Sequence, residues 1–349
     1  MLDRRICRVC LFIMSFAVAS LLGALVVADD SGGVVTKKIL SGLNHPTDLA
    51  IRPESGTDTY EVYVAEGGAG RVTKFRSDKP EKRADVVAGF STKSNSGAQS
   101  LYFLDHLRLV VAGRDDDGAP FVRLYELPDS ESPLTVDQHK DEAKLPESGA
   151  EPRLDAHVFR QLARTRANDR VGDYLIAAAA GQGESADLAY VPVRSGALGD
   201  VTGASLKNAS DNVQVDAITV ADNGYITVAV HSGGDTGEPS RLAFFNPLDR
   251  RVAMQMPSGL GHIVALAYSP KSGNLYAANA PAGDDAKGGI YRIDSAQTGS
   301  MPTCKAVKIT DVRNASALVF AADNTLYVAT AGSANDSTDG TLIKLTGSL

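Results

Sequence analysis

The sequence predicts an all-β fold, a six-bladed β-propeller, on the basis of three observations. First, a short apolar strand that ends in Ala, followed by a turn rich in Gly and Asp, recurs six times. Second, the copies begin 47, 66, 51, 49 and 51 residues apart, and a period near 50 made of strands and turns is typical of propeller blades. Third, about 320 residues follow the N-terminal segment, which gives about 53 per repeat, the size of one four-stranded blade. The six copies span residues 62–65, 109–112, 175–178, 226–229, 275–278 and 326–329.

Each copy is expected to be the second strand of its blade, because a shorter apolar segment precedes it and an alternating segment follows it. Blades one to three are expected to contain strands at residues 47–51, 60–65, 71–76 and 84–88, then 100–104, 108–112 and 121–127, then 158–163, 174–179 and 188–193. Blades four to six are expected at residues 216–220, 225–230 and 241–246, then 264–268, 274–278 and 289–293, then 317–320, 325–329 and 341–345.

The sixth blade runs out of chain after three strands. Residues 34–40 form a spare apolar and polar strand near the N-terminus. We expect this strand to close blade six as its outer strand, since that pairing removes an open sheet edge. Two polar segments interrupt the repeat: residues 128–155 are expected to hold the fourth strand of blade two, and residues 194–212 are expected to be a connection.

The first 28 residues are predicted to be a secretory signal peptide. Arg4, Arg5 and Arg8 precede an apolar run at residues 11–27, and small residues lead up to Ala28. An uncleaved membrane anchor is the alternative, because the run approaches the length of a membrane span. The domain organisation predicted is therefore a signal peptide at 1–28 and one propeller at 29–349, in a periplasmic or secreted protein without membrane insertion after cleavage. Cys304 would be the single cysteine of the mature chain, so no internal disulfide is expected.

The net charge is −7, and removal of residues 1–28, which carry three Arg and one Asp, would leave −9. An acidic protein of this kind is repelled by phosphate backbones and anionic lipids, which argues against a nucleic-acid partner. The partner expected is a small molecule or another protein.

The connections that enter the first strands of the blades are polar. Because first strands surround the central channel, these residues are expected to line one channel mouth, where propellers usually hold their ligands. The predicted ligand-binding residues are His45, Asp48, Asp216, His262 and Asn314. In this prediction His45 and His262 have the same offset from their strands, and Asp216 is placed at the position of Asp48.

Two metal sites are hypothesised from residue type and spacing. His45, His157 and His262 could form a three-imidazole site for a transition metal, although channel-lining or turn-capping histidines would show the same pattern. Asn335, Ser337 and Asp339 place oxygen donors at alternate positions before Gly340, as in a calcium loop, although ordinary β-turns have a similar composition. A divalent metal is the one cofactor that these residues suggest.

Residues 42–50, Gly-Leu-Asn-His-Pro-Thr-Asp-Leu-Ala, and residues 62–66, Val-Tyr-Val-Ala-Glu, resemble the opening blade of a group of secreted six-bladed propellers. The group comprises the NHL, SMP-30/gluconolactonase-like and sorbosone-dehydrogenase-like proteins. Gluconolactonase-type enzymes bind a divalent metal through a Glu at the first inner strand and through Asn and Asp from later blades. The resemblance implies Asp48 or Thr47 for the first role, in place of Glu, and Asn314 and Asp216 for the others.

Three hypotheses of function follow. The leading one is a non-catalytic, extracytoplasmic binding scaffold, because the chain shows no G-x-S-x-G, no H-E-x-x-H and no paired cysteines. The alternative is a metal-dependent hydrolase of the lactonase kind, with its site at the polar channel mouth. The third, an enzyme that oxidises quinones or sugars, is implied by the resemblance alone.

Overall fold

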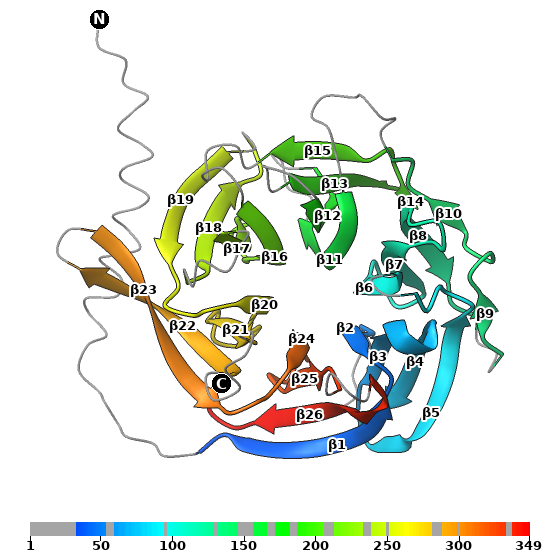
Figure 1. The fold of residues 1–349 in the computed structure, drawn as a ribbon, viewed down its shortest axis with the longest axis horizontal. Coiled ribbons are helices and arrows are strands. Elements are labelled where there is room, and N and C mark those ends of the chain that lie inside the picture. Colours follow the sequence, from blue (N-terminus) through cyan, green and yellow to red (C-terminus); the bar gives the residue numbers. More distant parts are fainter. Residues whose placement is uncertain are drawn as a thin grey trace, which may run out of the picture. The chain divides into compact units, whose positions relative to one another are not determined.

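The computed structural model describes residues 33–53, 59–93, 96–128, 132–145, 156–165, 172–181, 187–205, 213–232, 239–248, 251–280, 288–298, 301–332 and 337–349. Residues Val34–Gly347 form one compact unit together with Leu349. In this unit six β-sheets stand around a common axis, with their first strands innermost (Figure 1). The predicted six-bladed β-propeller is therefore confirmed. The predicted signal peptide lies outside the described residues, and among those that are described no helix is long and apolar enough to cross a bilayer.

The blades are numbered in chain order, and their strands run from the channel outward. Blade one contains β2 (Pro46–Ile51), β3 (Glu61–Glu66), β4 (Arg71–Arg76) and β5 (Lys79–Ala88), with the short helix η1 (Gly67–Ala69) between β3 and β4. Blade two contains β6 (Gly97–Phe103), β7 (Arg108–Arg114), β8 (Pro120–Glu126) and β10 (Asp141–Glu142). Blade three contains β11 (Ala156–Thr165), β12 (Tyr174–Gly181), β13 (Asp187–Arg194), β14 (Ala197–Leu198) and β15 (Thr202–Ser205).

The second half of the ring repeats this arrangement. Blade four contains β16 (Val213–Val220), β17 (Ile226–Ser232), β18 (Arg241–Asn246) and β19 (Arg251–Pro257). Blade five contains β20 (Ile263–Tyr268), β21 (Leu275–Asn279), β22 (Gly289–Thr298) and β23 (Met301–Thr310). Blade six contains β24 (Ala315–Phe320), β25 (Leu326–Thr330) and β26 (Gly340–Thr346), preceded by the short helix η3 (Ser337–Asp339), and is completed by β1 (Val35–Leu43).

The N-terminal strand closes the ring, as predicted. β1 pairs antiparallel with β26 from Val35 opposite Thr346 to Leu43 opposite Gly340, so the sheet order of blade six is β1-β26-β25-β24. Blue β1 and red β26 lie side by side in Figure 1. Because the last blade takes a strand from each end of the chain, these hydrogen bonds hold the ring shut.

Six hydrophobic clusters fill the spaces between neighbouring blades, one for each pair around the ring. The recurring second-strand motif supplies much of each cluster, because both faces of that strand are covered by adjacent blades. Tyr63 of blade one packs edge-on against Phe103 of blade two, with ring centroids 4.7 Å apart. Tyr276 and Phe320 repeat this contact between blades five and six at 5.1 Å. The repeat in the sequence is thus a repeat of inter-blade packing.

Two outer strands differ from the sequence-based expectation. Residues 128–155 do contain the fourth strand of blade two, β10, but they also contain β9 (Leu134–Thr135), which pairs parallel with β5 of blade one. Residues 194–212, expected to be a connection, contain β15, which pairs with β13 in blade three. Outer strands are short and pack against fewer neighbours, so their apolar pattern is too weak to identify from sequence.

A β-bulge near the start of the first strand recurs in the blades and positions the site. One residue stands unpaired between two register pairs in blades one, two, four, five and six. These bulged residues are Thr47, Gln99, Asp216, Val264 and Ser316. In blade three the irregularity is larger, and Arg160 and Gln161 both stand between the pairs of Phe159 and Leu162. Since a bulge redirects the side chain of the extra residue, it decides what faces the channel.

Candidate metal centre

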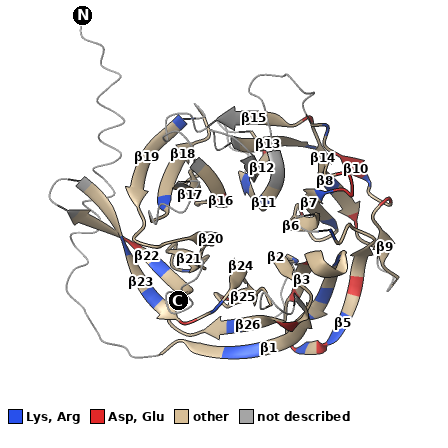
Figure 2. Ribbon diagram, in the orientation of Figure 1, with Lys and Arg blue, Asp and Glu red and all other residues tan. Residues whose placement is uncertain are grey.

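Charged residues are rare on the six first strands. Figure 2 shows Lys, Arg, Asp and Glu mainly on outer strands such as β1 and β5, whereas the strands around the axis are nearly free of them. The first strands carry four charged residues in total: Asp48, Arg160, Arg164 and Asp216. A charge in such a place is costly unless it is paired, so the partners of these residues locate the candidate site.

Asp216 is the centre of the candidate site. It is the bulged residue of β16, and its side chain is 1% exposed. Arg160 of β11 contacts its Oδ1 through Nη1, and His231 of β17 contacts its Oδ2 through Nδ1. His262, which directly precedes β20, places Nε2 3.4 Å from the same Oδ2. Blades three, four and five therefore meet at one carboxylate.

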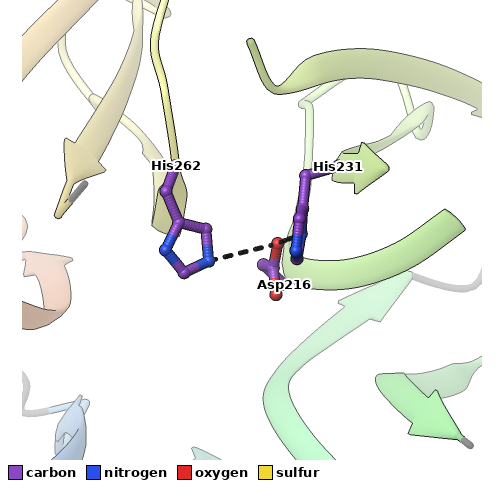
Figure 3. A group of neighbouring side chains, drawn as sticks. All are labelled: Asp216, His231 and His262. Carbon is purple, nitrogen blue, oxygen red and sulfur yellow. Dashed lines mark hydrogen bonds and ion pairs between the residues drawn. The ribbon is translucent and has the colours of Figure 1, made fainter. Parts of the chain in front are cut away.

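The two imidazoles face each other across this carboxylate, as Figure 3 shows. Their ring centroids are 5.0 Å apart and their planes are inclined by 58°. One ligand atom from each of Asp216, His231 and His262 lies within 4.8 Å of the other two. Two imidazole nitrogens and one carboxylate oxygen at such separations form a ligand set for a divalent transition metal.

The nitrogen of His262 that points at Asp216, Nε2, lies 3.4 Å from Oδ2 without forming a hydrogen bond of good geometry. It is shielded from solvent, and the described residues offer it no better acceptor or donor. A buried polar atom whose hydrogen bond is poorly formed is unfavourable, and in native proteins it often marks a place where a water or an ion binds. The residues present therefore fit a metal ion.

Asp216 is an anion at neutral pH. Burial by itself acts to raise the pKa of this carboxyl, since it disfavours the charged form. The contacts with His231 and His262 and the positive charge of Arg160 outweigh burial and hold the pKa below its usual value. The carboxylate is therefore ready to bind a cation without first losing a proton.

The loop that presents His262 is held by a group of buried polar contacts. Asn279 accepts a hydrogen bond from the His262 amide through Oδ1 at 2.9 Å, and the Ala280 amide donates to the His262 carbonyl at 2.9 Å. Ser240 accepts from the Ile263 amide at 3.1 Å, and its own amide donates to the Leu260 carbonyl at 2.7 Å. The backbone on both sides of His262 is thus fixed, which orients the imidazole in advance.

Gln161 of blade three reaches the first strands of blades four and five just beyond the site. Its Oε1 accepts from the amides of Ile218 and Leu266 at 3.1 and 3.4 Å, and its Nε2 donates to the Leu266 carbonyl at 3.0 Å. Ile218 and Leu266 lie further along their strands than Asp216 and His262, so these contacts are deeper in the channel. First strands have an unpaired edge, and Gln161 satisfies backbone groups of Ile218 and Leu266 on the edges of blades four and five.

The structure brings together two of the residues predicted from sequence, Asp216 and His262. It places Asp48 elsewhere, between blades one and two. There Asp48 Oδ2 accepts from the Ser100 hydroxyl at 2.6 Å and from the Leu101 amide at 2.9 Å. Burial raises the pKa of this carboxyl to about 7, against the lowering effect of these hydrogen bonds.

Asp48 and Asp216 differ by one residue of strand register. Ala65 in blade one and Ala229 in blade four occupy the same position of the second-strand motif. Ala65 pairs with Asp48, whereas Ala229 pairs with Ala217, the residue after Asp216. The structural counterpart of Asp216 is therefore Thr47, and the assumed equivalence with Asp48 was wrong. Because side chains alternate along a strand, a slip of one residue moves the carboxylate from the channel to the space between blades.

His45 and Asn314 do share the position of His262. Their carbonyls accept from the amides of Gly67 and Ala331, as that of His262 accepts from Ala280. Both are exposed and have positive φ, 48° for His45 and 51° for Asn314. Neither belongs to the Asp216 group, so His262 alone of the three has charged partners there.

The remaining predicted ligands are only partly described. His157 is on β11, and its side chain lies outside the described residues. For the hypothesised calcium loop, Asn335 also lies outside them, whereas Ser337 and Asp339 form the ends of η3 and Asp339 is exposed. Both hypotheses therefore stay predictions.

His231 and Arg160 were not among the residues predicted from the sequence. His231 follows the second-strand motif of blade four by two residues, at the end of the strand that faces the same mouth. Arg160 is one of only four charges on first strands. A search for charged residues within otherwise apolar inner strands could have found Arg160.

No protein-family model and no curated protein matches this sequence. Solved structures do resemble it. A glucose dehydrogenase-like oxidoreductase of Thermus thermophilus aligns with a TM-score of 0.57 at 15% identity, over 90% of this chain and 100% of the other. An α-L-arabinanase of Penicillium chrysogenum in complex with arabinobiose gives 0.56 at 12%, over 90% and 98%. The β-propeller domain of Cps50 (Swd1) of Myceliophthora thermophila gives 0.50 at 14%, over 89% and 88%. At these identities the likeness establishes the fold alone, and that fold serves enzymes and binding proteins.

Proposed function

We propose that this protein is an exported propeller that binds a divalent transition-metal ion at its channel mouth and holds a small ligand there. The observation that carries the proposal is the convergence of Asp216, His231 and His262, from three different elements, with ligand atoms within 4.8 Å of one another. Export rests on the signal-like residues 1–28.

The ligand types favour one class of ion. Imidazole nitrogen suits zinc, copper, iron and nickel, whereas calcium and magnesium prefer sites built from oxygen alone. Three protein ligands leave at least one coordination position open, the arrangement of catalytic rather than structural zinc sites. An ion held here would therefore be able to bind a ligand directly.

A metal-dependent hydrolase is the second candidate function, and the same open position favours it. A bound divalent ion can lower the pKa of a coordinated water and polarise an ester or lactone carbonyl. This second candidate goes with membership of the NHL and SMP-30/gluconolactonase-like group, which the repeated strand motif supports. The binding scaffold remains the simpler proposal because it requires no additional catalytic group.

The test is metal stoichiometry. The protein purified from an exporting host is stripped of metal, offered one to two equivalents of Co²⁺ and examined by visible absorption and elemental analysis. We expect about one ion per chain, and loss of binding in His231→Ala and His262→Ala. His45→Asn is the matched control, since it changes the equivalent position of blade one to the residue found in blade six. A wild-type protein that retains no ion after this treatment would refute the proposal.

A further inference from the structure

We infer that the ligand of this site is a small molecule that carries an oxyanion, a carboxylate or a phosphate, and that Arg160 recognises it. The inference rests on the proposed metal function and names the class of molecule that the metal would hold.

Asp216 uses its two oxygens for different partners. Oδ1 contacts Arg160, whereas Oδ2 lies against His231 and His262. A metal bound between the imidazoles would take Oδ2 and leave the contact of Oδ1 with Arg160 in place. The guanidinium is therefore held next to the metal position by the same carboxylate that ligates the ion.

Among the described residues, Arg160 uses only part of its donor capacity. A guanidinium carries five N–H groups in a planar fork, and within the part of the chain that the structure describes its contact is with Asp216 through Nη1. The side chain is 37% exposed, while its partner Asp216 is 1% exposed. The exposed edge of a guanidinium fits the paired oxygens of a carboxylate or phosphate.

The charges at the site also favour an anion. A divalent ion and Arg160 together carry three positive charges, and within the described residues Asp216 is the one carboxylate that contacts them. The two histidines would be neutral as ligands. The remaining excess of positive charge, partly shielded from water, attracts an anion to the open coordination position.

Gln161, the residue after Arg160, bonds to β16 and β20 deeper in the channel than the metal position, so Arg160 and the ion lie on the mouth side of these contacts. A small molecule that places one oxyanion between Arg160 and the metal satisfies both the geometry and the charge.

The experiment uses the full chain loaded with Co²⁺, titrated at constant ionic strength with acetate, oxalate, inorganic phosphate and phenyl phosphate, and with neutral acetamide. Binding is followed by the Co²⁺ absorption spectrum and by calorimetry. We expect at least one of the oxyanions to bind and acetamide not to bind. Whether the carboxylates or the phosphates bind more tightly shows which class of ligand the site prefers. Arg160→Gln should weaken oxyanion binding at least about tenfold, a loss of one good charge-assisted contact, and Arg160→Lys should fall in between.

The controls separate this inference from the metal proposal. Arg76→Gln removes an exposed guanidinium that is paired with Asp78 on a surface hairpin, and it should bind oxyanions as the wild type does. Unchanged oxyanion affinity in Arg160→Gln that still holds one Co²⁺, or equal binding of acetamide, would overturn the inference. If the wild type holds no Co²⁺, the metal proposal fails, and the same titrations of the metal-free protein decide whether oxyanions bind through Arg160. If Arg160→Gln no longer binds Co²⁺, the oxyanion affinity of Co²⁺-loaded Arg160→Lys is compared with that of the wild type instead.

Discussion

The buried carboxyl of Asp48 should make the stability of this propeller fall as the pH rises. Its folded pKa is about 7, whereas the ordinary value is 3.8. The folded state therefore binds the proton more tightly than the unfolded chain does, and the stabilisation is fully present below about pH 4 and is lost as the pH rises through about 7. Burial is the main cause, because it disfavours the carboxylate between blades one and two.

The size of the effect follows from the shift. One pKa unit corresponds to about 1.4 kcal/mol, so raising the pH from about 5 to about 8 should lower the free energy of unfolding by about 3 kcal/mol through this one group, as an upper bound. In Asp48→Asn the group no longer titrates. The carboxyl accepts hydrogen bonds from Ser100, Leu101 and Leu49, and the NH₂ group of Asn cannot accept them. The lost hydrogen bond lowers the free energy of unfolding by about 1–3 kcal/mol at every pH.

The assay is denaturant unfolding of wild type and Asp48→Asn at several pH values between about 5 and 8. The variant should have the lower free energy of unfolding at low pH, and its difference from the wild type should shrink or change sign as the pH rises. Asp78→Asn is the control, since that carboxyl is exposed and its pKa is lowered by Arg76, so it titrates below this range. A gap between wild type and Asp48→Asn that stays constant across the range would refute the reasoning.

Three further predictions concern closure, support of the site and processing. Deletion of residues 34–40 should expose the edge of β26 and abolish cooperative unfolding, and an unchanged melting curve would contradict closure by β1. Asn279→Ala should weaken Co²⁺ binding about tenfold or more, because the amide of His262 loses its acceptor, while equal affinity would show that this contact does not orient the imidazole. N-terminal sequencing of the exported protein should begin at Asp29, and retention of Met1 on a membrane-bound form would argue for the uncleaved anchor.

The blade repeat could be predicted from sequence because it reflects packing. The second strand of each blade is covered on both faces, so its motif is almost entirely apolar, as in the segment that contains Tyr63 and the one that contains Tyr276. The closing strand could be predicted from the count of strands in blade six. The outer strand β15 could not, because four residues that include Gly203 and Ser205 carry little apolar signal.

The candidate site was only half predictable, for reasons of register. The position before each first strand is set by the repeat, and the structure places His262 there, beside Asp216. The bulge inserts one residue into the first strands of blades one and four, and no sequence pattern predicts where. Because of this shift, Asp216 points to the imidazoles, whereas Asp48 points to blade two. His231 lies on β17, the hairpin partner of β16, so pairing within blade four brings it to Asp216, whereas Arg160 comes from the neighbouring blade three and no local spacing links it to the site.

Binding of a metal ion by Asp216, His231 and His262 can be tested by anomalous diffraction at the zinc edge, from crystals of the protein prepared with Zn²⁺. A strong anomalous peak is expected about 2.0–2.2 Å from His231 Nδ1, His262 Nε2 and an oxygen of Asp216. Crystals that show no peak between these three side chains, while zinc is bound elsewhere on the protein, would contradict it.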